Sequence, residues 1–140
     1  MNANPTSAAP AAPASTPSTH RAPVRAQSPT TLASFDAYQV APSACSACAG
    51  FAPSLDANLR SQMTRAASSV VLNIAEGFGS SSRGVKRRHY EIARGSATEC
   101  VAVLDLACAL GIVSADQVAT AHTLFTRICM MLARLQARFA

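Results

Sequence analysis

Apolar side chains recur at every third or fourth position along most of the second half of this 140-residue chain. Such spacing places side chains on one face of an α-helix. No stretch of the sequence shows the strict alternation that is typical of a β-strand. The sequence therefore predicts an all-α fold. The first stripe comprises Leu55, Leu59, Met63, Ala66, Val70 and Ile74.

Sequence signals predict the limits of the helix that carries this stripe. Ser54 is a preferred N-cap residue, and Asp56 follows in the first turn, where the helix dipole favours a carboxylate. Gly77 is predicted to lie just beyond the end of the helix, because glycine tolerates the left-handed conformation found there. The segment from Gly77 to Gly84 is rich in glycine and serine and is predicted to be a mobile loop.

Two more helices follow this loop. One is predicted from about Val85 to Leu110, with a stripe of Ile92, Ser96, Cys100, Val103, Ala107 and Leu110. Gly111 ends it, and Ser114 with Gln117 forms a capping box for the last helix. The seam of that helix runs at heptad-like spacing through Val118, Ala121, Phe125, Ile128, Leu132, Leu135 and Phe139.

The first part of the chain is less regular. Residues 32–49 form a weak helix candidate in which Pro42 is expected to kink or end the helix near Ala41. Residues 1–31 are rich in Ala, Pro, Ser and Thr and are predicted to be a disordered leader. Residues 32–140 are predicted to fold as an up-down four-helix bundle, because short connectors join neighbouring antiparallel helices.

Composition limits the kind of protein this is. No run of eighteen apolar residues lacks charges, so we expect no membrane contact. The odd number of cysteines and the lack of a secretory signal predict free thiols and a cytoplasmic location. Cys45 and Cys48 form a CxxC pair, but no second ligand pair accompanies it, so we expect no metal and no cofactor.

One helix has more apolar surface than a single bundle would cover. From Ala97 to Leu110 the third helix is apolar on nearly all sides, which is typical of a helix buried on most sides. We therefore expect copies of the chain to assemble, with an interface at Val101, Leu104 and Cys108.

Basic residues gather at the start of the third helix: Arg83, Lys86, Arg87 and Arg88, with Arg94 two turns further on. Cations are unfavourable at a helix N-terminus, so this placement suggests an external anion such as phosphate. The alternative is a solvated turn. The nearby rings are Phe78 and Tyr90, so stacking of bases is expected to be weak.

A second set of polar residues is Arg65, Asn73, Glu76 and Glu99. An antiparallel third helix would bring Glu99 within reach of Arg65, and a buried Asn73 would need hydrogen-bond partners. We interpret the set as a buried polar network that fixes helix register. A hydrolytic or metal site is the other possibility.

The ordered run of Arg65-Ala-Ala, Asn73-Ile-Ala-Glu-Gly77 and Gly95-Ser96 with Glu99 resembles the 23S rRNA intervening-sequence proteins, over about residues 51–135. That family is similar to the accessory variability proteins of diversity-generating retroelements. The resemblance implies a four-helix bundle in a homo-oligomeric ring, a pentamer by family analogy. From the retroelement relatives it also implies a basic surface for nucleic acid and for a reverse-transcriptase-like protein. It does not imply catalysis.

Two functions fit these observations. The first is a non-catalytic oligomer whose basic turn binds nucleic acid, preferentially structured RNA, or an RNA-associated protein. The second is a purely structural or adaptor oligomer that binds a protein partner. Neither requires a small-molecule substrate, and the sequence contains no nucleophile elbow, P-loop or dinucleotide-binding motif.

Overall fold

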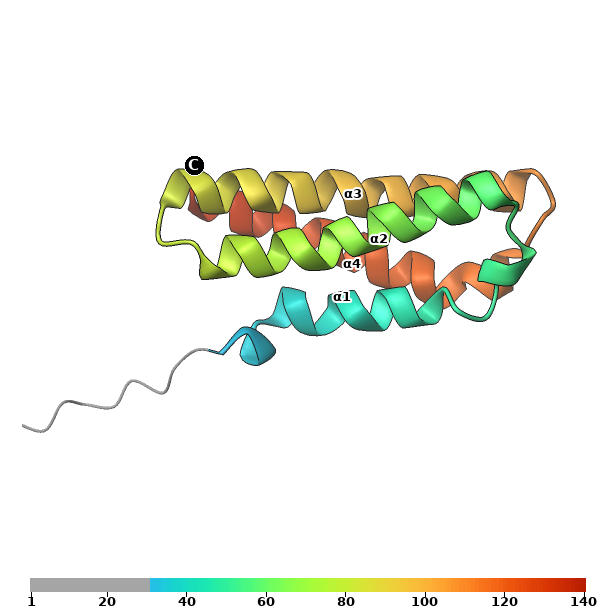
Figure 1. Ribbon diagram of the computed structural model, residues 1–140, viewed down its shortest axis with the longest axis horizontal. Coiled ribbons are helices and arrows are strands. Elements are labelled where there is room, and N and C mark those ends of the chain that lie inside the picture. Colours follow the sequence, from blue (N-terminus) through green and yellow to red (C-terminus); the bar gives the residue numbers. More distant parts are fainter. Residues whose placement is uncertain (1–30) are drawn as a thin grey trace, which may run out of the picture.

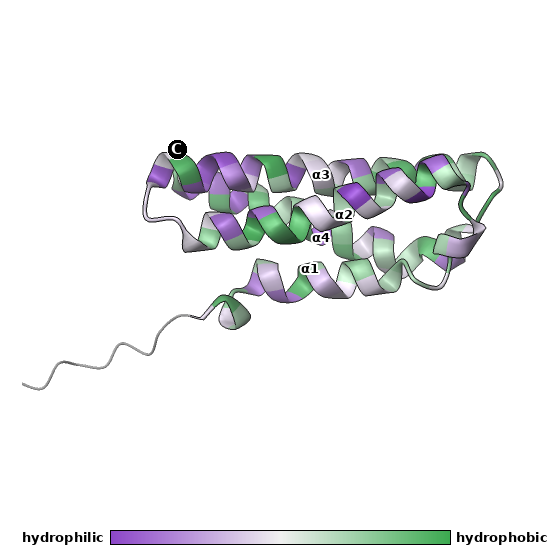
Figure 2. Ribbon diagram, in the orientation of Figure 1, coloured by the Kyte–Doolittle hydropathy of each residue, from purple (hydrophilic) through white to green (hydrophobic). Residues whose placement is uncertain are grey.

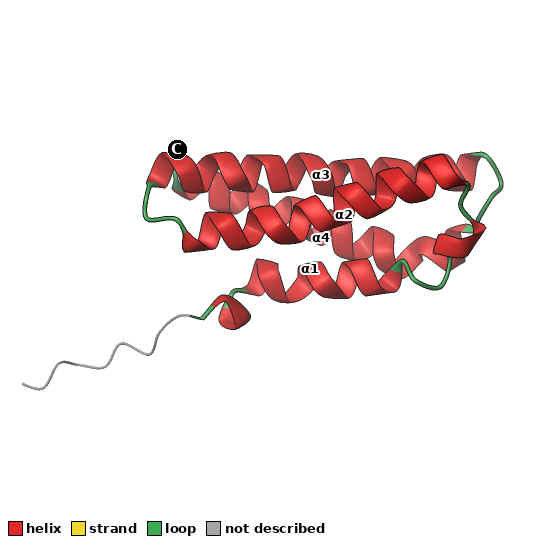
Figure 3. Cartoon of the chain, viewed as in Figure 1, coloured by secondary structure: helices red, strands yellow, loops and turns green. Residues whose placement is uncertain are grey.

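The computed structural model describes residues 31–140, so the predicted leader lies almost entirely outside the described residues. Four α-helices run antiparallel to their neighbours in chain order (Figure 1): α1 (Asp36–Ala47), α2 (Ala57–Gly79), α3 (Arg83–Ala109) and α4 (Ala115–Arg138). Short 3-10 turns at Leu32–Ser34 and Ala52–Ser54 precede α1 and α2. This part of the chain has no strand (Figure 3). The predicted all-α class and the four helices are confirmed.

Polar side chains cap the starts of α2, α3 and α4. Ser114 and Gln117 form the predicted capping box of α4: Gln117 Oε1 accepts from Ser114 N–H at 2.7 Å, and Ser114 Oγ accepts in return at 3.3 Å. The predicted start of α2 is wrong. Asp56, not Ser54, is its N-cap and accepts from Leu59 N–H at 2.8 Å. A carboxylate also interacts favourably with the positive end of the helix dipole.

The predicted end of α2 is also wrong. Gly77 lies inside the helix and is buried, and α2 continues to Gly79. Only residues 80–82 separate α2 from α3, so the predicted loop of residues 77–84 is mostly helical. Ser82 caps α3 by accepting from Val85 N–H at 3.4 Å. The two long helices are therefore joined by a tight turn.

The core lies along the axis between the four helices, where α2 and α4 contribute the predicted stripes. On α3 the prediction is confirmed in part: Cys100, Val103 and Ala107 are buried, whereas Ile92 and Leu110 are 39% and 61% exposed. The complete buried face comprises Tyr90, Ala93, Ala97, Cys100, Val103, Leu104 and Ala107. Small residues fill much of this face, and two of them, Ala93 and Ala97, were not in the predicted stripe.

The first helix is much shorter than the others, twelve residues against twenty-seven in α3. It continues past Pro42, whose ring lies on the exposed side, so the predicted end near Ala41 is wrong. Its small residues Ala37, Ala41 and Ala44 pack closely on the core, and most of the helix is pale in Figure 2. Because α1 spans only part of the bundle, hollows open beside its two ends. Within residues 31–140, no helix has the length and apolar character needed to cross a membrane.

Candidate nucleic-acid interface

One end of the bundle gathers positive charge from α3 and α4. The start of α3, the end of α2 and the end of α4 lie there together, and the C-terminus is beside the start of α3 (Figure 1). Arg83 Nη2 donates to the backbone oxygen of Arg138 at 3.0 Å, which joins α3 directly to the last turn of α4. We call this end the basic pole; its cations are Arg83, Lys86, Arg87, Arg88, Arg94, Arg134 and Arg138.

Two of the predicted anion-binding residues are engaged within the protein. Lys86 Nζ donates to the backbone oxygens of Gly77 and Phe78 at 3.1 and 3.0 Å, at the end of α2. Arg83, besides its bond to α4, places its guanidinium 5.9 Å from the centre of the Phe139 ring. A cation near the carboxyl end of a helix is favourable, because the dipole is negative there.

These contacts change the argument for an external anion. Arg83 and Lys86 start a helix where cations are unfavourable, but each also lies at the carboxyl end of a neighbouring helix. The antiparallel fold therefore accounts for their placement. Arg87, Arg88 and Arg94 are exposed and make no side-chain hydrogen bond or ion pair with the residues that the structure describes.

The sequence-based prediction missed Arg134 and Arg138, which are exposed near the end of α4. They are about fifty residues from the basic turn in sequence, yet the fold places them at the same end. The signal was present in the up-down topology itself. A fourth antiparallel helix must end beside the start of the third, so arginines in its last turns belong to the same surface.

Aromatic rings also gather at the basic pole. Phe35 lies 5.3 Å from Phe78 and 6.2 Å from Tyr90, measured between ring centres, and Tyr90 lies 5.9 Å from Phe139. Tyr90 is buried, whereas the other three are partly exposed. The expectation that few rings lie near the basic turn is therefore wrong, because the fold adds Phe35 and Phe139 from the two ends of the described chain.

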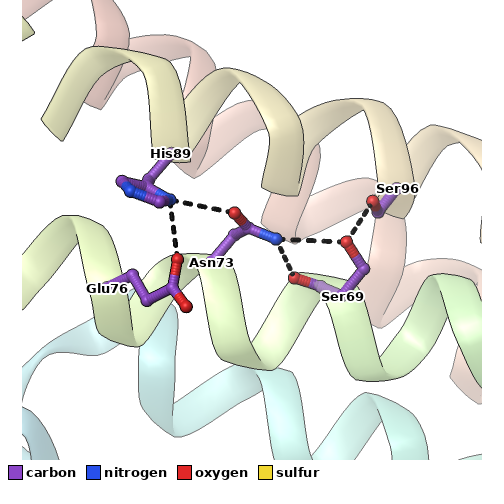
Figure 4. Close-up of polar contacts among 5 residues, drawn as sticks. All are labelled: Ser69, Asn73, Glu76, His89 and Ser96. Carbon is purple, nitrogen blue, oxygen red and sulfur yellow. Dashed lines mark hydrogen bonds and ion pairs between the residues drawn. The ribbon is translucent and has the colours of Figure 1, made fainter. Parts of the chain in front are cut away.

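A chain of polar contacts joins α2 to α3 beside this pole (Figure 4). His89 Nδ1 is 3.0 Å from both Asn73 Oδ1 and Glu76 Oε2. Asn73 Nδ2 donates to the backbone oxygen of Ser69 at 2.9 Å, and Ser96 Oγ donates to Ser69 Oγ at 2.8 Å. Because both partners of His89 Nδ1 are acceptors, that nitrogen carries the proton.

Half of the predicted polar network takes part in this chain. Asn73 and Glu76 belong to it, together with the serines and His89, which the sequence-based prediction left out. Arg65 and Glu99 are exposed, and no ion pair joins them in the described part of the chain. The network is also partly exposed rather than buried, and its contacts join α2 to α3.

Residues 35–134 match the model of the family described as 23S rRNA-intervening sequence protein. The chain belongs to this family. No curated protein and no solved structure matches the chain significantly. The match begins at Phe35 and so includes α1, which precedes the residues 51–135 that carried the resemblance.

Several residues that suggested the 23S rRNA-intervening sequence family have defined positions. Gly77 lies under the ring of Tyr90, and Asn73 holds the contact to His89. Gly95 lies on an exposed part of α3 with no atom near the position of a side chain. Glycine in an exposed helix interior costs about 1 kcal/mol relative to alanine, and nothing within the single chain offsets that cost.

The outer face of α2 and α3 carries unusual apolar exposure. Leu72 and Leu110 are each 61% exposed, and Leu106 is 47% exposed. Val85, Ile92 and Leu106 are separated by seven and fourteen residues, which places them along one side of α3. We call these side chains, with Leu72 and Leu110, the apolar outer face.

The interface residues predicted from the sequence need one correction. Leu104 is fully buried in the core of its own chain, because it lies on the side of α3 that faces the other helices. Val101 and Cys108 are partly buried and pack against the same core. Most of the exposed large apolar side chains belong to the apolar outer face, and Met130 on α4 is 54% exposed as well.

The five cysteines lie on or beside α1, α3 and α4. Cys45 and Cys48 line a hollow of about 230 Å³ beside the end of α1. All five cysteines are free thiols, and burial raises the pKa of Cys45, Cys48 and Cys100. In residues 31–140, no three His, Cys, Asp or Glu side chains are grouped so that they could hold a metal ion.

Proposed function

We propose that this protein is a non-catalytic, homo-oligomeric bundle that binds structured RNA through its basic pole. The observation that carries the proposal is the convergence of exposed arginines from α3 and α4 at one end. The described ion pairs, Glu76–His89 and Asp105–His122, use histidines, so no carboxylate neutralises these arginines. The family name, which refers to 23S rRNA, supports RNA as the anion.

Arginine suits this role because its planar guanidinium donates two parallel hydrogen bonds to a phosphate. Arg87, Arg88 and Arg94 come from α3, and Arg134 and Arg138 come from α4. Charges spread over two helices fit phosphates along a backbone better than a single small anion. Binding of this kind weakens steeply with salt, because each neutralised phosphate releases a condensed counterion.

The test compares equal changes of charge at the two ends of the bundle. Arg87→Ala with Arg88→Ala removes two exposed cations from the basic pole, and Arg60→Ala with Arg65→Ala removes two from the other end of α2. Binding of labelled rRNA hairpins at low salt is measured by fluorescence anisotropy. The proposal expects the first pair to weaken binding by at least tenfold and the second pair to leave it within about twofold. No binding by the unaltered protein, or equal losses in both pairs, contradicts it.

We propose that the apolar outer face forms the contact between copies of the chain, in a ring of five as the family resemblance implies. Two features support this contact: the aligned Val85, Ile92 and Leu106, and Gly95 among them, whose missing side chain leaves room for a close neighbour. A ring would repeat the basic pole, so weak contacts to RNA would add as avidity. Light scattering gives the molar mass, and a monomer at micromolar concentration would contradict the assembly.

A specific observation also favours the alternative function, an adaptor that binds a protein partner. The apolar outer face exposes several large apolar side chains that another protein could cover, such as the reverse-transcriptase-like partner that the resemblance implies. Protein purified without nuclease distinguishes the two. Co-purified RNA supports the first proposal, whereas a stoichiometric protein and no nuclease-sensitive material supports the second. Either function suits the cytoplasm, where the five free thiols would stay reduced.

A further inference from the structure

We infer that the basic pole selects RNA with unpaired nucleotides, and that a groove between α1 and α4 receives one unpaired base. This inference rests on the proposed RNA binding and adds the class of RNA and a site for it. The groove lies beside the start of α1, where that short helix leaves the end of α4 uncovered. Its volume is about 310 Å³.

The groove has an apolar floor and a charged rim. Phe35, Met131 and Leu135 line it and are each partly buried. Arg134 and Arg138 also line it and are exposed. A ligand that fits both parts is flat and apolar on its faces and carries a negative charge beside them, which describes a nucleotide.

Asp36 gives the groove a direction. Its exposed carboxylate lies on the α1 side, opposite the arginines on α4. A phosphate is repelled there, whereas the amino group of adenine, cytosine or guanine can donate a hydrogen bond to a carboxylate. The base therefore lies towards α1 and its phosphate towards Arg134 and Arg138.

The rings of the basic pole support unpaired rather than duplex RNA. Phe35, Phe78 and Phe139 are each partly exposed, so part of each ring is accessible to a base that has left its stack. Bases within a duplex are already stacked and paired and cannot enter a groove. For this reason, proteins that recognise an RNA sequence generally bind the unpaired nucleotides of loops, bulges and ends. Stacking on aromatic or guanidinium planes contributes most of the gain.

The experiment uses the full chain and three RNA hairpins that share one stem. The first stem is fully paired, the second carries a one-nucleotide bulge, and the third carries an abasic residue at the bulge. Binding is measured by fluorescence anisotropy at fixed salt. We expect the bulged hairpin to bind at least about fivefold more tightly than the other two, as expected for one stacked base.

Matched variants locate the base. Met131→Glu places a carboxylate in the groove, and Met130→Glu places the same charge one residue away, on an exposed position outside it. Met131→Glu should abolish the preference for the bulge, and Met130→Glu should retain it. Because Met131 is partly buried, Arg134→Ala provides a second variant at an exposed position, with Arg127→Ala as its control on the same helix. Arg134→Ala should lower the preference at least threefold, and Arg127→Ala should not.

The outcomes separate this inference from the function on which it rests. Salt-dependent binding with equal affinity for all three hairpins overturns the inference and leaves RNA binding in place. A preference for the bulge that Met130→Glu and Met131→Glu reduce equally overturns the groove as its site. If an acidic, apolar peptide binds in the groove and the bulged RNA does not displace it, the groove is assigned to a protein ligand instead. No binding of any hairpin overturns both proposals.

Discussion

The ring of Tyr90 on α3 lies directly against the backbone of Gly77 on α2. A side-chain carbon added at Gly77 would meet Tyr90 Cε1 at 2.5 Å and Cδ1 at 2.9 Å. Tyr90 is 2% exposed and packs between Phe35 and Phe139, so the ring has little room to move away. The absence of a side chain at Gly77 therefore lets α2 and α3 approach closely at the basic pole.

Gly77→Ala should destabilise the protein, because the added methyl group overpacks a rigid site. A loss of about 1–3 kcal/mol in the free energy of unfolding is expected from such overpacking. Gly79→Ala is the matched control, since nothing lies within 4 Å of a side chain there, and it should change the free energy by less than about 0.5 kcal/mol. Urea unfolding followed by circular dichroism measures both. Equal changes in the free energy of unfolding of the two variants would show that the Tyr90 ring can move to make room for the methyl group.

Lys86 and Arg87 should separate stability from RNA binding. Lys86→Met removes two charge-assisted hydrogen bonds to the end of α2, and we expect about 1–2 kcal/mol of destabilisation for a partly exposed group. Arg87→Met removes the same charge from a side chain without such partners, so it should leave the unfolding midpoint nearly unchanged and weaken RNA binding. Denaturation and anisotropy on both variants check this. The opposite pattern would mean that Lys86 is the residue that holds the phosphate.

Thiol reactivity should follow burial. Burial, and to a smaller extent the neighbouring Cys45, raises the pKa of Cys48 to about 11. At pH 8 only about one Cys48 in a thousand then carries the reactive thiolate. Iodoacetamide should modify the partly exposed Cys108 first, and Cys48 should react about tenfold faster for each unit of pH between 8 and 10. Peptide mass spectrometry gives the rates. Equal rates for Cys48 and Cys108 at pH 8 would contradict the packing of α1.

The same pKa makes stability depend on pH. The folded chain holds the proton of Cys48 up to about pH 11, whereas the unfolded chain releases it near pH 9. The contribution of the protonated Cys48 to the free energy of unfolding is therefore fully present below about pH 9, and it is lost as the pH rises from 9 to 11. Cys48→Ala should unfold with a flatter dependence on pH across this range. Chemical denaturation at several pH values would reveal the difference.

Much of the helical core could be predicted from the sequence, because period and burial coincide on α2 and α4. Leu59, Val70 and Ile74 are buried where their spacing placed them. On α3 only part of the face was predicted correctly, because Ala93 and Ala97 bury little area individually, while the larger Ile92 lies outside. The size of a side chain indicates how much free energy its burial contributes. It does not indicate which face of the helix the other helices cover.

The site was harder to predict, because it depends on contacts between distant parts of the chain. The basic turn is visible in the sequence, but Lys86 reaches the end of α2 and Arg83 reaches the end of α4 only in the folded bundle. His89 carried no recognisable motif, since its partners come from another helix. Local charge identified the surface, and tertiary contacts decided which of its cations remain free.

Ile92→Glu should dissociate the proposed assembly without unfolding the chain. The side chain is 39% exposed in the single chain, so a carboxylate can reach water there at little cost to folding. In an interface it would be buried without a partner, and an unpaired buried charge costs several kcal/mol. Ala119→Glu, at an exposed position on α4, makes the same change of charge away from the apolar outer face. Light scattering should show a smaller particle for Ile92→Glu alone, with the helical content retained. An unchanged mass in both variants would place the contact between copies on another face.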